Sequence, residues 1–170
     1  MLYNLTKHGN RKVIFILGKG RLLNQSIVSK KPNALFCEAA CPVQVIEIAE
    51  KQFLQLMEQS HALTRAVLRE YERNLWRMGH QLKNTTGNMQ MERKIAAKLW
   101  KLGRDFGVDT EDGVMIDIDL TITLMADLVG APRENVSRAC KVLTDRGLIR
   151  YGNKRFILID FDGLAKFYKM

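Results

Sequence analysis

Short apolar runs, without a helical period, mark the first 50 residues. RKVIFIL (11–17) and VQVIEI (43–48) are rich in β-branched residues, and ALFCEA (34–39) is a weaker run of the same kind. The residues that separate them are typical of turns: Gly18, Gly20, Pro32 and Pro42. The pattern predicts a small antiparallel β unit of three strands.

From about Lys51 the apolar period becomes helical. A short amphipathic turn over 53–57 precedes a longer helix that starts after Ser60, and Gly87-Asn88 is predicted to end it. An ordinary helix on the core of its own domain is one interpretation. A heptad seam that meets a second copy in a parallel homodimer is the favoured one. The seam has alternating steps of 3 and 4 residues: His61, Thr64, Leu68, Tyr71, Leu75, Met78, Leu82 and Thr85.

Residues 89–129 predict a helix, a turn, a strand and a helix. MQMERKIAAKLWKLGRDFG (89–107) has a buried face made of Ile95, Leu99 and Leu102. DTEDG (109–113) is typical of a turn, and VMIDIDL (114–120) alternates like an edge strand. Thr121 is placed to cap a helix whose inner face has the spacing i, i+3, i+4, i+7: Ile122, Met125, Ala126 and Val129.

The next segment completes a recognisable order of elements. Gly130 is predicted to end the preceding helix, Pro132 suits the first turn of the next one, and Gly147 is predicted to end that helix. LIRY-GN-KRFILI (148–159) predicts a hairpin with a tight turn at Gly-Asn. Strand, helix, glycine turn, helix and hairpin is the order of a winged helix-turn-helix. The buried face of its second helix is predicted to be Val136, Ala139, Cys140 and Leu143.

The opposite face of this second helix carries Arg133, Glu134, Ser137, Arg138 and Lys141 on one stripe. Ordinary solvated charges, with Glu134 and Arg138 as an i, i+4 pair, are the plain interpretation. However, arginine can donate twice to guanine and a carboxylate can accept from cytosine, whereas a carboxylate repels phosphate. An acid between two arginines, beside a basic hairpin tip (153–155), therefore favours base recognition in DNA.

Charge and composition agree with a polyanionic partner. The chain has 27 Lys+Arg against 18 Asp+Glu, a net charge of +9, and 46% hydrophobic residues, enough for a folded core. No apolar run reaches 18 residues and no small-residue cleavage site follows the short apolar run VIFIL, so neither a transmembrane span nor a signal peptide is expected. Three cysteines fit no disulfide framework and favour a reducing cytoplasm.

The chain resembles the Crp/Fnr family of bacterial transcription factors over nearly its whole length. LTITLMADLVGAPRENVSRACKVLTDRGLIRYGNKRFILID (120–160) is similar to the DNA-binding signature, and residues 8–53 are similar to later strands of the sensor β-roll. The resemblance implies an α+β fold with a partial antiparallel β-roll (1–57), a dimerisation helix (58–86) and a C-terminal winged helix-turn-helix (87–170). Since Met1 falls in mid-roll, a fragment or a shortened product is expected, with a rearranged, swapped or disordered N-terminus.

The resemblance also implies site residues. The fumarate-nitrate pattern falls on Glu134, Ser137 and Arg138, which implies TTGA-like inverted repeats. Pro132 stands where a phosphate-contacting Ser or Thr is common, and Asn135 is a substitute. The expected dimer interface is Thr64, Leu68, Tyr71, Leu75, Met78 and Leu82. The full expected DNA-binding set is Arg133, Glu134, Asn135, Ser137, Arg138, Lys141, Thr123, Lys154 and Arg155.

Cyclic AMP is not expected as the effector. Where the family has Gly-Glu-Leu, this chain has Gly20-Arg21-Leu22, so a cation replaces the carboxylate that binds the ribose. In Pro32-Asn33-Ala34-Leu35, the neutral Asn33 replaces the arginine that pairs with the cyclic phosphate. Another small molecule or a redox signal is expected instead, with no cofactor assigned. RNA polymerase is an additional possible partner at GVDTEDG (107–113), where family members can touch it.

Other chemistry is weakly signalled. Cys37 and Cys41 could form a thiol switch or a metal site, but small buried cysteines on a sheet are favoured. His8, His61 and His80 lack ligand spacing, so no metal is expected. No Gly-rich phosphate loop or nucleophile elbow is visible, so the chain is not expected to be an enzyme. The alternatives are a dimerising protein-interaction module and, less favoured, a thiol- or metal-dependent enzyme.

Overall fold

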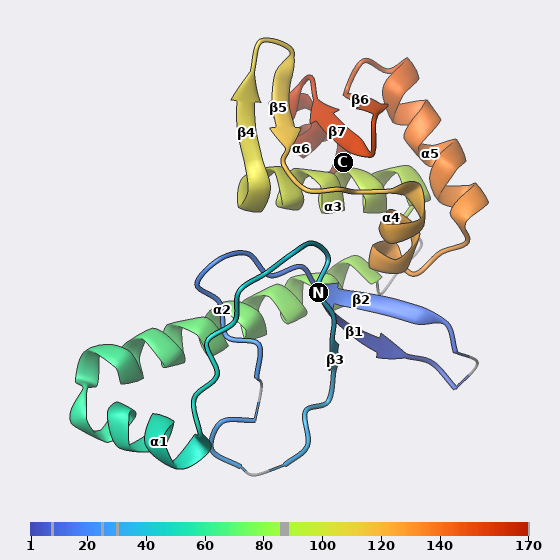
Figure 1. The fold of residues 1–170 in the computed structure, drawn as a ribbon. Coiled ribbons are helices and arrows are strands. Elements are labelled where there is room, and N and C mark those ends of the chain that lie inside the picture. Colours follow the sequence, from blue (N-terminus) through green and yellow to red (C-terminus); the bar gives the residue numbers. More distant parts are fainter. Residues whose placement is uncertain (8, 25, 30, 86–88, 170) are drawn as a thin grey trace. The chain divides into compact units, whose positions relative to one another are not determined.

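The computed structural model describes residues 1–170 except 8, 25, 30, 86–88 and 170, and leaves the side chains of 83–85 undescribed. Contacts divide the chain into two compact units, residues 1–4 with 15–87 and residues 5–14 with 88–170 (Figure 1). The predicted helix end at Gly87-Asn88 lies outside the described residues. The three-part domain division stays a prediction.

A small sheet begins the chain. Its strands are β1 (Leu2–Leu5), β2 (Arg11–Phe15) and β3 (Phe36–Cys37), in the order β2-β1-β3, and β1 pairs antiparallel with β3. Two of the three predicted strands are thus confirmed. The third is wrong: residues 43–48 form no strand, and Ile46 is 89% exposed. β-Branched residues favour strands only where a neighbouring strand supplies hydrogen bonds and packing, and no described strand pairs with this segment.

Two helices follow in the first unit. They are α1 (Glu50–Gln59) and α2 (His61–Thr85), so the predicted short turn is a helix of 10 residues. Ser60 makes the joint: its N–H donates to Leu56 O at 3.0 Å, and its Oγ accepts from Leu63 N at 3.2 Å. This side-chain cap satisfies one of the exposed N–H groups at the start of α2.

The second unit is built around α3 (Met91–Phe106), which packs against the other three helices of the unit and the sheet. The sheet has the antiparallel order β4-β5-β7-β6. Ile95, Leu99 and Leu102 are buried as predicted. The other elements are β4 (Gly107–Thr110), β5 (Gly113–Ile116), α4 (Ile122–Val129), α5 (Arg133–Asp145), β6 (Ile149–Gly152), β7 (Arg155–Leu158) and α6 (Phe161–Lys169).

Two features of this unit differ from the prediction. Asp109 and Thr110 belong to β4, so the predicted turn shrinks to Glu111-Asp112, and β5 ends at Ile116 instead of continuing to residue 120. Helix α6 was not predicted, although Asp160 caps it by accepting from Gly163 N at 2.7 Å. Its apolar period spans only two turns, which is too short to stand out in the sequence.

The α+β class is confirmed by the two antiparallel sheets and the helices around them. In Figure 1, α4 and α5 lie together at one side of the second unit, and β4 and β5 lie at the other. The described residues contain no helix that is both long and apolar enough to cross a membrane.

Candidate nucleic-acid interface

Helix α4 begins and ends where its residue types require. Thr121 Oγ1 accepts from Leu124 N at 3.0 Å, which confirms the predicted cap. Gly130 ends the helix with φ 73°, a left-handed conformation that favours glycine. The inner face differs from the prediction, because Met125, Ala126 and the unpredicted Leu128 are buried, while Ile122 and Val129 are only half-buried. Helix α4 packs against both α3 and α5, so more than one stripe is covered.

Helix α5 is anchored by one fully buried stripe. Val136, Ala139, Cys140 and Leu143 are all 5% exposed or less, as predicted. Burial raises the pKa of the Cys140 thiol to about 11, so this cysteine is a packing residue. Pro132 lies just before the first helical residue, one position earlier than predicted, and its carbonyl accepts from Val136 N at 3.2 Å.

The opposite side of α5 is exposed and charged. Asn135 is half-buried beside this side, and it accepts a hydrogen bond from Arg138 Nη2 at 2.5 Å. Asn135 thus orients a guanidinium that the sequence pattern alone would pair with Glu134. The exposed stripe consists of the predicted residues Arg133, Glu134, Ser137, Arg138 and Lys141.

The hairpin after α5 forms the wing, defined here as β6, β7 and their turn. The predicted turn at Gly152-Asn153 is wrong by one residue: Gly152 pairs with Arg155, and Asn153 and Lys154 have φ of 50° and 59°. Positive φ at both central residues is the type I′ geometry that suits strand twist. Lys154 is therefore exposed at the tip, and Thr123 is exposed near the start of α4.

Arg155 has partners that the sequence did not reveal. Its Nη1 pairs with Asp117 Oδ1, and its Nη2 lies 3.7 Å from Asp119 Oδ1. Arg150, the wing's other arginine, pairs with Asp112. In the wing, Lys154 is therefore exposed to solvent, while both arginines contact carboxylates.

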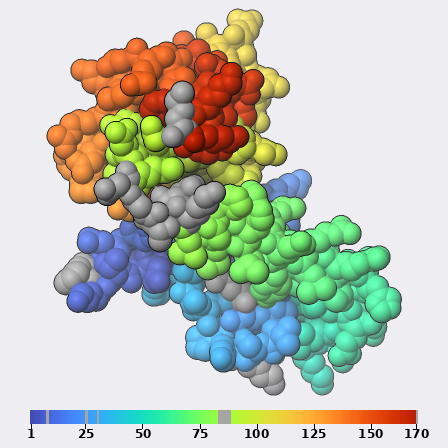
Figure 2. Space-filling model, turned by 180° about the vertical axis from the view of Figure 1, so that it is seen from behind, coloured from blue at the N-terminus to red at the C-terminus, as the bar shows by residue number. Residues whose placement is uncertain are grey.

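The predicted dimer seam lies on α2 as a largely exposed apolar stripe. Leu68 is 60% exposed, Leu75 73% and Leu82 63%, and Tyr71 and Met78 are exposed as well. Figure 2 shows the side chains of α2, in green, at the surface of the face that it draws. Thr64 differs, since it is half-buried and donates its hydroxyl to Met57 O at 2.6 Å.

The region expected to bind an effector has a specific ion pair. Arg21 Nε lies 3.1 Å from Glu70 Oε1 on α2, with both side chains largely buried. Burial raises the pKa of Glu70, while Arg77 and a hydrogen bond from Asn74 act in the opposite direction. Arg21, which stands where Gly-Glu-Leu would have its glutamate, thus joins the loop after β2 to α2.

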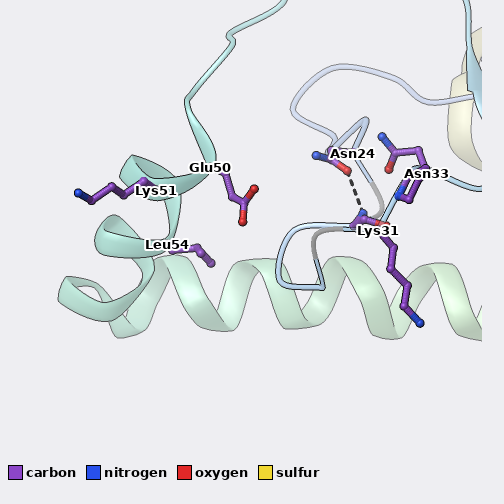
Figure 3. Close-up of a pocket in the computed structure, with 8 residues that line it drawn as sticks. Asn24, Lys31, Asn33, Glu50, Lys51 and Leu54 are labelled. Carbon is purple, nitrogen blue, oxygen red and sulfur yellow. Dashed lines mark hydrogen bonds between the residues drawn. The ribbon is translucent and has the colours of Figure 1, made fainter.

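An open groove of about 650 Å³ lies in the same unit. Figure 3 shows that the start of α1 supplies one wall, with Glu50 and Leu54, and that the loop carrying Asn24 and Asn33 supplies the other. Its full lining is Asn24, Ser26, Lys31, Pro32, Asn33, Glu50, Lys51 and Leu54.

Cys37 and Cys41 are both exposed, so the prediction of buried cysteines is wrong. Strand β3 is only two residues long: Cys37 is its last residue and is exposed, and Cys41 lies beyond it. Within the described residues, no three His, Cys, Asp or Glu side chains gather in a way that could hold a metal ion. His8 lies outside those residues.

Comparison with known proteins identifies the C-terminal part. Residues 93–167 match the model of the Crp-like helix-turn-helix domain. The CRP-like cAMP-activated global transcriptional regulator of Mycobacterium tuberculosis is 24% identical over 159 residues, 93% of this chain and 70% of the relative. The global nitrogen regulator of Nostoc sp. is 26% identical over 117 residues, 69% of this chain and 52% of the relative.

Solved structures share the fold. A CRP/FNR-family transcriptional regulator from Thermus thermophilus has a TM-score of 0.79 at 20% identity, covering 99% of this chain and 82% of that chain. The c-di-GMP-responsive regulator CLP of Xanthomonas campestris has a TM-score of 0.76 at 16% identity, covering 92% and 78%. Residues 93–167 thus form a Crp-like helix-turn-helix domain, and the chain as a whole shares the fold of solved CRP/FNR-type transcription regulators.

Proposed function

We propose that this chain is a dimeric, sequence-specific DNA-binding regulator of the Crp/Fnr type that recognises TTGA-like inverted repeats. The observation that carries the proposal is the division of α5 into a fully buried stripe and an exposed stripe of Arg, Glu, Ser and Lys. Burial on one side fixes the helix in the domain, so that the other side can enter a major groove.

Each exposed side chain of α5 has a proposed role. Arg138 donates to guanine O6 and N7, and Glu134 accepts from cytosine N4. Ser137 and Arg133 contact a base or phosphate, and Asn135 keeps Arg138 in place through their hydrogen bond. The phosphate contacts are proposed for Thr123, Lys141, Lys154 and Arg155.

The exposed seam of α2 supports a homodimer. Exposed leucines at heptad spacing are costly in water and pack well against an identical stripe. A two-fold dimer would present two α5 helices to half-sites about one helical turn apart, in keeping with an inverted repeat.

The proposed signal is a small molecule or a redox change other than cyclic AMP. Arg21 is already paired with Glu70, and Asn33 carries no positive charge for a cyclic phosphate. A ligand near α1 or α2 would shift the population between two arrangements of the dimer helices. We also propose cytoplasmic action and an RNA polymerase contact at the exposed Glu111-Asp112 turn.

Binding to duplex DNA across salt concentrations tests the proposal. The purified protein is titrated onto a TTGA inverted repeat and a scrambled duplex of equal length. Tighter binding to the inverted repeat, weakening steeply with salt, is expected. Absence of binding to either duplex at low salt would contradict the proposal and favour a protein-interaction module.

A further inference from the structure

The wing lies beside two outward-pointing carboxylates. Asp117 and Asp119 belong to the segment between β5 and α4, and both contact Arg155 on β7. Ile116 and Leu120 are fully buried, whereas Asp117 and Asp119 are exposed. This alternation is what an extended segment produces, and it places both acids on the outer side with the wing arginine.

Backbone hydrogen bonds hold the acidic segment against the wing and against the end of α3. Leu120 N donates to Lys154 O at 2.7 Å, and Asp117 N donates to Phe106 O at 2.8 Å. Strand β5 also pairs with β7, with Val114 opposite Leu158. The contact with Arg155 therefore follows from the fixed path of the chain on both sides of the two acids.

The result is a wing with balanced charge. It has three cations, Arg150, Lys154 and Arg155, and its two arginines contact three carboxylates, those of Asp112, Asp117 and Asp119. A wing that only gripped phosphate would gain nothing from these acids, because each repels the DNA backbone. Arg155 must leave Asp117 and Asp119, or share them, before it can bind a phosphate.

We propose that Asp117 and Asp119 are specificity-determining residues, which occupy Arg155 in place of a phosphate and so limit the sequence-independent grip of the wing. This rests on the proposed DNA-binding function and deepens it. Because non-specific binding grows with each phosphate neutralised, restraining one arginine per subunit leaves more of the discrimination to α5. At a specific DNA site, the bound α5 holds the wing beside the backbone long enough for Arg155 to exchange Asp117 and Asp119 for a phosphate.

Neutralising the two acids tests the proposal. Asp117→Asn with Asp119→Asn should tighten binding to the scrambled duplex several-fold, and should steepen its salt slope by about one per subunit. The ratio of affinities for inverted repeat and scrambled duplex should fall. A matched control is Asp105→Asn with Asp162→Asn, which gives the same change in net charge but leaves the wing untouched.

The Arg155→Gln background separates a specific effect from a general one. There, Asp117→Asn with Asp119→Asn should no longer change the salt slope. Equal gains from the control pair, or an undiminished gain without Arg155, would overturn the proposal while DNA binding stands. If neither wild type nor variants bind any duplex at low salt, the proposed function fails, and this inference fails with it.

Discussion

Cys140, Val136 and their neighbours on α5 show what single residues reveal in the sequence. Their spacing identified the buried stripe correctly, because a helical period fixes which side chains share a face. The same rule identified the exposed stripe with Glu134 and Arg138. Side-chain partners could not be predicted in the same way: Arg138 donates to Asn135, and Arg155 pairs with Asp117, 38 residues away, which only the folded chain brings close.

Cysteine reactivity should follow burial. Cys37 and Cys41 are exposed and should react rapidly with a thiol reagent at pH 8, whereas Cys140 should react only on unfolding. With a pKa of about 11, the Cys140 thiol is about one part in a thousand thiolate at that pH. A count of fast and slow thiols before and after denaturation checks this. Three equally fast thiols would show that α5 is not packed as described.

At the scale of elements, helices were predicted better than strands. The extents of α3 and α5 follow their apolar periods and end residues, and α2 starts after Ser60 as predicted. Residues 43–48 have strand-like composition but no described partner, and strand formation depends on neighbours distant in sequence. The turn of the wing shifted by one residue because Gly152 could be accommodated in the ladder.

Removal of the α4 cap should destabilise the second unit. Thr121→Ala loses the acceptor for Leu124 N, and the free energy of unfolding should fall by about 1 kcal/mol. Thr123→Ala, at an exposed position two residues later, should change it by less than about 0.5 kcal/mol. Urea denaturation of both variants checks this. Equal losses would mean that the hydroxyl of Thr121 is not a cap.

The seam of α2 should control association. Leu75→Glu places a charge in the middle of the exposed apolar stripe and should convert the dimer to a monomer at micromolar concentration. Arg73→Glu, also exposed on α2 but off the seam, should leave the dimer intact. Sedimentation equilibrium distinguishes them. A monomeric wild type, or a dimeric Leu75→Glu variant, would contradict the proposal that the seam is the dimer interface.

At the scale of the whole molecule, dimerisation and DNA recognition should be linked. A monomer can occupy one half-site only, so Leu75→Glu should bind an inverted repeat and a single half-site with similar affinity. Wild type should prefer the inverted repeat by at least about 100-fold, because the second half-site is bound intramolecularly. Titrations of wild type and Leu75→Glu on the inverted repeat and on the single half-site measure these affinities. An equal preference for the inverted repeat in both proteins would show that dimerisation and DNA recognition are not linked.

Base recognition by α5 and phosphate contact by the wing are distinguished most directly by comparing Arg138→Ala with Lys154→Ala. Both variants lose one exposed cation, one on α5 and the other at the wing tip. The affinity ratio for the inverted repeat and duplexes with single-base changes is measured for each. Arg138→Ala should lose about 1–3 kcal/mol at one base position and relax specificity there. Lys154→Ala should weaken all duplexes alike and reduce the salt slope by about one. An equal loss of specificity in both variants would contradict this division between α5 and the wing.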